Sequence, residues 1–292
     1  MPIADSAPET VNPALAGSVM GSDAALSRSH ATNLARQAWD EAAPLHERLT
    51  LENLVEKFRD PAFGCLDAVH VAELQRIGLT GRAVAQFNTN NGRELISVQR
   101  LGAERCVGFD ISTGFVGQAR EIAAAAGNPC EFVVSDIYEI PQSFHDSFDL
   151  VFATAGALCF MPDLEGYFSV ARKLLKSGGR ISLYDCHPIL DMYKLDRERN
   201  GMPPALEFSY FDEEPKLRQG GLDYHSNSTY DAKPIYYFHH RLSSILMASI
   251  RSGFDLEFFD EYPIDPSQAC RSLERVANQP PLSFILTARK IG

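Results

Sequence analysis

The sequence predicts an α/β fold in which a doubly wound, mostly parallel sheet is covered by helices on both faces. Short apolar segments alternate with amphipathic helical segments from residue 81 onward, and this alternation is typical of the class. Several of the apolar segments end in a polar residue, as expected where strands open onto a ligand-binding edge. The chain has 292 residues, of which 45% are hydrophobic, so it can bury the core of one large domain.

Five strands are expected in the first part of this domain, at residues 83–87, 105–109, 131–135, 148–154 and 180–185. The helices between them are expected to begin at N-caps such as Ser112 and Asp163 and to end at glycines, as at Gly178-Gly179. A last helix from residue 242 to Gly253 precedes two further strands, at 256–262 and 283–289. The repeated strand–helix order predicts that the first five strands are parallel.

Three other regions flank or interrupt this domain, which we assign to residues 81–292. Residues 1–29 are rich in Ala, Ser, Pro and Gly and are expected to form a flexible tail. Residues 30–80 predict a helical cap of three short helices, the second starting at Thr50 as its N-cap. Residues 188–238 are too long for an ordinary connection after the fifth strand. We expect this insertion to be a lid that shapes a substrate pocket, although its composition also fits a peripheral loop.

The composition argues against several kinds of partner. A formal net charge of −11, without a basic patch, argues against nucleic acid. The 6 cysteines follow no zinc spacing, so no metal is expected and buried thiols in a reducing compartment are the simplest interpretation. No apolar run has the length of a membrane span and no signal peptide is recognisable. These observations predict a cytoplasmic protein without a membrane partner, either a monomer or a homodimer.

Two acidic residues at the ends of successive strands indicate a nucleoside-binding site. Asp110 ends the second strand, where its carboxylate can accept both ribose hydroxyls, and Asp136 ends the third, where it can accept the adenine amino group. The turn at 88–92 leads into a helix N-terminus, whose N–H groups suit a carboxylate or phosphate. Asn tolerates positive φ, so this Asn-rich turn can replace part of a glycine-rich one. Either aspartate alone fits a simple helix cap, but the pair favours the site.

Five segments in order resemble the motifs of class I S-adenosylmethionine-dependent methyltransferases: 84–92, 107–112, 135–137, 148–155 and 174–180. The resemblance implies a Rossmann-like sheet of seven strands with an antiparallel last strand at 283–289. It also implies S-adenosyl-L-methionine as the cofactor. The residues that it assigns to the cofactor site are Gln86, Asn88, Asn90, Gly92, Asp110, Ile111, Asp136, Ile137 and Thr154.

The first motif departs from the family pattern. Only Gly92 of its three glycines is present, because Asn88 and Asn90 occupy the other two positions, and Gln86 replaces the usual acidic residue. A subgroup of small-molecule methyltransferases is similar in this respect. Its other sequence features match Arg100-Leu101-Gly102-Ala103, His187-Pro188 and His240-Arg241-Leu242-Ser243. The changed turn therefore does not imply an inactive site. NAD is a competing cofactor, but the chain lacks the G-x-G-x-x-G turn that NAD-binding Rossmann enzymes have after the first strand.

Methyl transfer mainly requires alignment and exclusion of water, with a general base only where the acceptor must lose a proton. The candidates for that base are His187 and Asp185 after the fifth strand and His240, or its neighbour His239, at the last helix. Among the histidines we favour His187, because the strand end, the following proline and the start of the insertion all place it at the ligand edge. For each histidine, a structural hydrogen bond is an equally good interpretation. The residues expected to line the substrate pocket, where an aromatic ring can contact a sulfonium, are Trp39, His46 and Tyr193.

These residues predict an enzyme that transfers the methyl group of S-adenosylmethionine to N, O or S of a small molecule by in-line displacement, in small-molecule or secondary metabolism. An alternative keeps the fold and the cofactor: azetidine-2-carboxylate synthases resemble class I methyltransferases but cyclise S-adenosylmethionine and release methylthioadenosine. A third alternative is a non-catalytic cofactor-binding partner protein. The acidic pair and the long insertion argue against the third.

Overall fold

A single seven-stranded sheet organises the protein, which is described by a computed structural model over residues 26–194, 205–223, 230–267 and 270–292. The strand order is β3-β2-β1-β4-β5-β9-β8. The first five strands pair in parallel, and β9 pairs antiparallel with both β5 and β8, which confirms the predicted sheet and its antiparallel last strand. The strands are β1 (Ala83–Phe87), β2 (Arg105–Asp110), β3 (Glu131–Val134), β4 (Phe148–Ala153), β5 (Leu175–Cys186), β8 (Phe254–Tyr262) and β9 (Ser283–Lys290).

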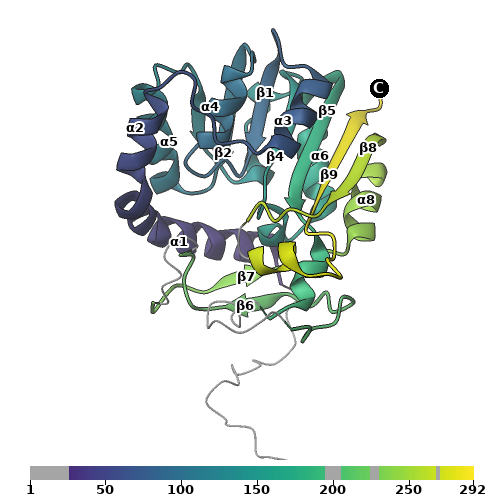
Figure 1. Ribbon diagram of the computed structural model, residues 1–292. Coiled ribbons are helices and arrows are strands. Elements are labelled where there is room, and N and C mark those ends of the chain that lie inside the picture. Colours follow the sequence, from purple (N-terminus) through teal and green to yellow (C-terminus); the bar gives the residue numbers. More distant parts are fainter. Residues whose placement is uncertain (1–25, 195–204, 224–229, 268–269) are drawn as a thin grey trace, which may run out of the picture.

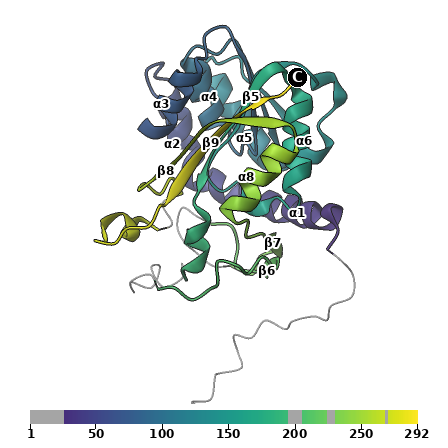
Figure 2. The ribbon, with the colours of Figure 1, turned by 90° about the vertical axis from the view of Figure 1, so that its right-hand side faces the viewer.

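Helices cover both faces of the sheet (Figure 2). One face carries α3 (Ala68–Ile77), α4 (Arg93–Arg100) and α5 (Thr113–Ala125), and the other carries α6 (Leu164–Leu174) and α8 (Leu242–Arg251). Both predicted N-caps are present: the side chains of Ser112 and Asp163 accept hydrogen bonds from the first turns of α5 and α6, at 3.3 and 2.8 Å. The strand order reverses between β1 and β4, so a ligand crevice is expected at the carboxyl ends of these strands.

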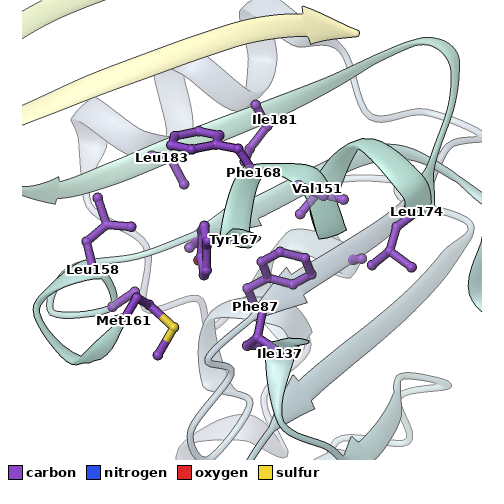
Figure 3. Packing of buried hydrophobic residues seen from close by; sticks show 14 of the residues in the cluster. Phe87, Ile137, Val151, Leu158, Met161, Tyr167, Phe168, Leu174, Ile181 and Leu183 are labelled. Atoms are coloured by element: carbon purple, nitrogen blue, oxygen red, sulfur yellow. The ribbon is translucent and has the colours of Figure 1, made fainter. Parts of the chain in front are cut away.

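The core holds the end of β1 in place. Side chains alternate along a strand, so Ala85 and Phe87 enter the core under α6, whereas Val84 enters the core under α4 and α5. The rings of Phe87 and Tyr167 are fully buried and meet edge to face, with centroids 5.1 Å apart. Figure 3 shows these rings packed together with Phe168 between the sheet and α6. The buried ring of Phe87 therefore fixes the end of β1, from which the next turn starts.

The N-terminal cap differs from its prediction at one junction. Helix α1 (Arg28–His46) continues through a π-helical turn, Glu47–Leu51, directly into α2 (Glu52–Phe58). The prediction that Thr50 caps a new helix is wrong, because its hydroxyl donates to the carbonyl of His46 at 2.8 Å from inside the continuous helix. Ser27 caps α1, so residues 28 and 29 belong to the helix and not to the expected tail. Residues 1–25 of that tail lie outside the described residues.

The change from α6 to β5 also comes earlier than predicted. The helix ends at Leu174, and β5 starts at Leu175 rather than at residue 180. Leu175 is fully buried and pairs with Phe148 of β4, which draws the chain into the sheet before the glycines are reached. Gly178 then takes a positive φ of 71° within the strand, where the pairing with β4 is irregular.

The insertion after β5 contains a small structure of its own. A 3₁₀ helix, η6 (Pro188–Met192), is followed by the antiparallel pair β6 (Lys216–Arg218) and β7 (Ile235–Tyr237). Figure 1 shows α1 along the carboxyl-end edge of the sheet, with β6 and β7 beneath it. Residues 195–204 and 224–229 of the expected lid lie outside the described residues. None of the helices in the described ranges is long and apolar enough to cross a membrane.

Candidate active site

The turn after β1 takes the backbone shape that a glycine-rich turn would take. Asn88 and Asn90 have positive φ angles of 52° and 50°, and Gly92 follows with 74°. Asn reaches this left-handed region at low cost because its short side chain can bond to the nearby backbone, as Asn90 Oδ1 does in accepting from the N–H of Asn91 at 2.8 Å. A Cβ at Gly92 would lie 2.5 Å from the ring of Phe132, so this position requires glycine.

A pair of variants at Asn90 tests this backbone conformation. We expect the free energy of unfolding of Asn90→Ala to be about 1–2 kcal/mol below that of Asn90→Gly, because alanine pays the full cost of a left-handed φ. Urea unfolding followed by circular dichroism measures the difference. Equal stability of the two variants would show that residue 90 does not hold a positive φ in solution.

The acidic pair lies at the carboxyl ends of β2 and β3. Asp110 Oδ2 accepts from the N–H of Asn90 at 2.7 Å, and its Oδ1 accepts from the N–H of Ser112 at 2.9 Å. Asp136 Oδ1 accepts from the N–H of Tyr138 at 3.0 Å. An ionised carboxylate has about four acceptor positions, so both groups keep capacity for a ligand. Burial raises the pKa of Asp110 to about 6. Each aspartate thus caps its loop and also faces the crevice.

One cavity of about 1520 Å³ connects this pair to the insertion. Its volume exceeds the range of roughly 300–1,000 Å³ that is typical for one drug-sized ligand, so it has room for a cofactor together with an acceptor. The predicted site residues that line it are Trp39, Asn88, Asn90, Asp110, Ile111, Asp136, Ile137, Thr154, Asp185, His187, Tyr193 and His240.

Three predicted site residues lie behind the cavity wall: Gln86, Gly92 and His46. Gln86 is fully buried, and its Oε1 accepts from Thr89 Oγ1 at 2.9 Å, beneath the turn. His46 is also buried and bonds through Nε2 to the carbonyl of Leu222 at 2.7 Å. Because a carbonyl only accepts, Nε2 carries the proton. These residues support the turn and the insertion instead of facing the cavity.

Asp185 is placed as an anchor for the loop after β4. Its carboxylate accepts from the N–H groups of Gly156, Leu158 and Cys186 at 2.6, 3.1 and 2.8 Å. Burial raises the pKa of Asp185 to about 6, against the effect of these three donors. Three backbone donors occupy most of its acceptor capacity, so holding the loop is the role that this geometry favours.

His187 accepts one hydrogen bond at Nδ1 and has a carboxylate close to Nε2, without the geometry of a hydrogen bond there. Its Nδ1 accepts from the N–H of Ile189 at 3.1 Å, and its Nε2 lies 2.8 Å from Glu261 Oε1. Burial lowers the pKa of His187, so the ring is neutral with its proton toward the carboxylate. The ring links the end of β5 to β8, which leaves little capacity for a proton from an acceptor.

His240 is placed differently. Its Nε2 bonds to the carbonyl of Met161 at 2.8 Å, so Nε2 carries the proton and Nδ1 carries the lone pair. Burial lowers the pKa of His240, which keeps the ring neutral. Of the three predicted candidates, this residue has the geometry that best suits a general base.

An ion pair between the start of the insertion and the residue that follows it was not expected from the sequence. His239 Nδ1 lies 2.7 Å from Asp191 Oδ2, and its Nε2 donates to the carbonyl of Tyr210 at 2.8 Å. Asp191 Oδ1 accepts from the hydroxyl of Tyr237 at 2.6 Å. Burial opposes the charge on His239, but the bond to Asp191 and its negative charge raise the pKa of His239. The doubly bonded imidazolium ties η6, the segment before β6 and the end of β7 together.

Asp40 of α1 also contacts the loop beside Asp110, which the sequence did not predict. Its Oδ1 accepts from the hydroxyl of Ser112 at 2.8 Å, next to Asp110. The two residues are 72 positions apart in the chain, so no local sequence pattern predicts this contact. Among the described residues, no group of three or more His, Cys, Asp or Glu side chains is placed to hold a metal ion.

Comparison with known proteins agrees with this arrangement. Residues 87–183 match the family model described as a methyltransferase domain. A methyltransferase dependent on S-adenosylmethionine from Mesorhizobium loti superposes with a TM-score of 0.57 at 21% identity, covering 76% of this chain and 98% of that one. Geranyl diphosphate C-methyltransferase from Streptomyces coelicolor A3(2) superposes with a TM-score of 0.52 at 12% identity, covering 77% and 79%. These likenesses establish the fold.

A curated relative matches over a shorter stretch. The lovastatin nonaketide synthase mokA of Monascus pilosus is 37% identical over 94 residues, which are 31% of this chain and 3% of that protein. The fold is that of the S-adenosylmethionine-dependent methyltransferases with which the chain superposes. Within it, residues 87–183 form a methyltransferase domain.

Proposed function

We propose that this methyltransferase transfers a methyl group to nitrogen, oxygen or sulfur of a small molecule that binds beneath the insertion. The observation that supports this proposal is the cavity of about 1520 Å³. Its cofactor end contains Asp110 and Asp136, and its other end reaches Tyr193 and Tyr237 of the insertion. An acceptor beneath the insertion would therefore lie beside the cofactor.

The cofactor fits the residues at the strand ends. We assign Asp110 to the two ribose hydroxyls, Asp136 to the adenine amino group, and Ile111 and Ile137 to the faces of the base, since all four line the cavity. When bound, S-adenosylmethionine supplies a methyl group already activated on a sulfonium. The protein then has to align the acceptor with that methyl group and exclude water.

Aromatic side chains enclose the region between the two ends. The rings of Trp39 and Phe160 meet edge to face with centroids 5.3 Å apart, and Phe160 meets Tyr237 at 6.1 Å. All three residues line the cavity. Their rings supply apolar walls and faces that attract a positive charge. Where the acceptor must lose a proton, we assign its removal to Nδ1 of His240.

One solved neighbour is geranyl diphosphate C-methyltransferase, and another is a protein of echinomycin biosynthesis. The curated relative is a polyketide synthase by its name, lovastatin nonaketide synthase. A small-molecule acceptor for this chain agrees with these neighbours.

Mass spectrometry of the reaction products tests the proposal. The purified protein is incubated with S-adenosylmethionine alone, and with S-adenosylmethionine plus the low-molecular-weight fraction of a cell extract. We expect S-adenosylhomocysteine to accumulate only with the added fraction, because methyl transfer needs a second reactant. Methylthioadenosine formed without acceptor, well above its spontaneous rate, would contradict methyl transfer and favour cyclisation of the cofactor.

A further inference from the structure

The side of the cavity that the insertion forms differs in charge from the side at the strand ends. Among the described lining residues from 26 to 187, six are acidic and two are basic, not counting histidine. Between 188 and 238, four are basic and three are acidic, and we call this group the insertion wall. It consists of Asp191, Lys194, Asp212, Lys216, Arg218, Asp223 and Lys233. The insertion wall is therefore the more basic side of the cavity, in a chain whose net charge is −11.

Two of the basic side chains in the insertion wall are paired within the insertion. Lys194 Nζ lies 2.9 Å from a carboxylate oxygen of Glu207. Lys216 Nζ lies 3.0 Å from a carboxylate oxygen of Asp212, one turn earlier in the chain. Their charges are thus balanced by local partners, and they need no ligand.

The other two basic side chains belong to Arg218 and Lys233. Neither makes an ion pair or a hydrogen bond with any described residue. Arg218 ends β6 and pairs with Ile235 at the start of β7, and Lys233 precedes Ile235 by two residues. Two positive charges without a carboxylate partner among the described residues therefore lie at the same end of the β6–β7 pair.

The guanidinium of Arg218 lies over the ring of Tyr237, with its Cζ 3.9 Å from the ring centroid. This cation–π contact pairs none of the five N–H donors with an oxygen acceptor, so they are available to a ligand. Tyr237 is itself held in place, because its hydroxyl donates to Asp191 at 2.6 Å. Burial raises the pKa of Cys159 well above its usual value, and the positive charge of Arg218 opposes that rise. The charge of Arg218 thus acts on a buried residue of the cavity lining.

A guanidinium without a carboxylate partner favours a negatively charged ligand. Its N–H donors form a fork that matches two oxygens of a carboxylate or a phosphate. A cationic acceptor would be repelled here, and a neutral one would leave Arg218 and Lys233 without a counter-charge. The strand ends, by contrast, carry Asp110 and Asp136, which would repel an anion. An anionic group on the acceptor would therefore face the insertion wall.

We propose that the methyl acceptor carries an anionic oxygen group, a carboxylate or a phosphate, which binds to Arg218 with Lys233 as a second positive charge. This inference rests on the proposed function, because it assigns the group to the acceptor. The anionic group lies toward the β6–β7 pair, and the atom that receives the methyl group lies toward the strand ends. Arg218 therefore determines specificity and takes no part in the chemical step.

Calorimetry with small probes tests the site without turnover. The protein is saturated with S-adenosylhomocysteine and titrated with benzoate, with phenyl phosphate, and with benzamide, which has the size of benzoate without its charge. We expect at least one of the two anions to bind about fivefold or more tightly than benzamide, because hydrogen bonds between charged groups are the stronger ones. Solvent screening keeps the expected effect modest, since Arg218 is exposed. The anion that binds more tightly distinguishes a carboxylate from a phosphate.

Variants locate the preference on the insertion wall. Arg218→Gln should reduce the preference for the anion over benzamide to within about twofold, and Lys233→Gln should reduce it in part. Arg59→Gln is the matched control, since Arg59 does not line the cavity and its side chain is 62% exposed. This control should keep the wild-type preference.

The acceptor itself provides a second measurement. The low-molecular-weight fraction that supports S-adenosylhomocysteine formation is passed over an anion-exchange resin at pH 7.5. We expect the supporting material to be retained and to elute with salt. With that eluate, Arg218→Gln should need about fivefold or more material for half its maximal rate, with a maximal rate within about twofold of wild type. This separation is expected of a residue that binds the acceptor away from the reacting atom.

Two results would overturn the inference. One is a wild-type protein that binds neither anion more tightly than benzamide, or a preference that persists in Arg218→Gln. The other is an acceptor that passes through the resin without being retained. Failure of the proposed function is a different result: no fraction would then support S-adenosylhomocysteine formation, while the probe titrations would still decide whether Arg218 binds anions.

Discussion

Asp110→Ala is expected to reduce the affinity for S-adenosylmethionine at least tenfold. The variant removes the carboxylate that we propose as the acceptor of two ribose hydroxyls, and each hydroxyl left unpaired in a closed site costs roughly 1–3 kcal/mol. Burial raises the pKa of Asp110 to about 6, because the ionised carboxylate is less stable away from water. A ligand that donates hydrogen bonds to this carboxylate offsets that destabilisation. Calorimetry at pH 7.5 measures the effect under conditions where the group is charged.

A control must separate lost binding from lost structure, because Asp110 also accepts from the N–H groups of Asn90 and Ser112. Thermal unfolding of the variant, followed by circular dichroism, monitors the fold. Asp255→Ala is a matched loss of one carboxylate, at an exposed position of β8 far along the sheet from β2. Wild-type affinity in a folded Asp110→Ala protein would remove Asp110 from the cofactor site.

Replacing residues 205–237 with a short Gly/Ser linker is expected to abolish the formation of S-adenosylhomocysteine while cofactor binding persists. The change removes Tyr237 and the rest of the β6–β7 pair, which we place on the acceptor side of the cavity. The groups assigned to the cofactor come from the strand ends and remain. Residues 188–194 are kept because Leu190 is buried in a small core with Leu273 and Leu282.

The expected result is therefore a separation of two measurements, product formation and cofactor affinity. Tyr237→Phe gives a milder comparison, because it removes only the hydroxyl that donates to Asp191. We expect this variant to retain part of the activity. If the protein with the linker still produced S-adenosylhomocysteine at the wild-type rate, the insertion would be peripheral, as its composition also allowed.

The parts of the fold that follow from local pattern were predictable from the sequence. The order of strands and helices, the caps at Ser112 and Asp163, and the positions of Asp110 and Asp136 at strand ends depend on residues that are close in the chain. The start of β5 at Leu175 was not predictable in this way, because pairing with Phe148 overrides the glycines that follow. The continuous turn at Thr50 likewise contradicts a locally reasonable N-cap.

In the candidate site, too, some features follow from local sequence and others depend on residues that are distant in the chain. The left-handed Asn88 and Asn90 follow from a local rule about asparagine. The surroundings of His187 do not, since Glu261 lies on β8 and the sequence contains no sign that this carboxylate approaches the ring. The bond from His239 to Asp191 spans 48 positions. A side chain's capacity for chemistry depends on which of its atoms are already bonded, and that is decided by the tertiary structure.

Helix α1 touches both ends of the cavity. Asp40 holds Ser112 beside Asp110, whereas Glu41 Oε2 accepts from the N–H of Lys233 at 2.7 Å and His46 bonds to the carbonyl of Leu222 in the insertion. A helix tends to move as one rigid element. A shift of the insertion would therefore also displace the part of α1 that contacts Ser112 in the loop after β2. Occupancy of one end and affinity at the other are then thermodynamically linked, and the linkage is reciprocal. If binding of the proposed acceptor beneath the insertion changes the affinity for the cofactor through α1, the cofactor changes the affinity for that acceptor by the same factor.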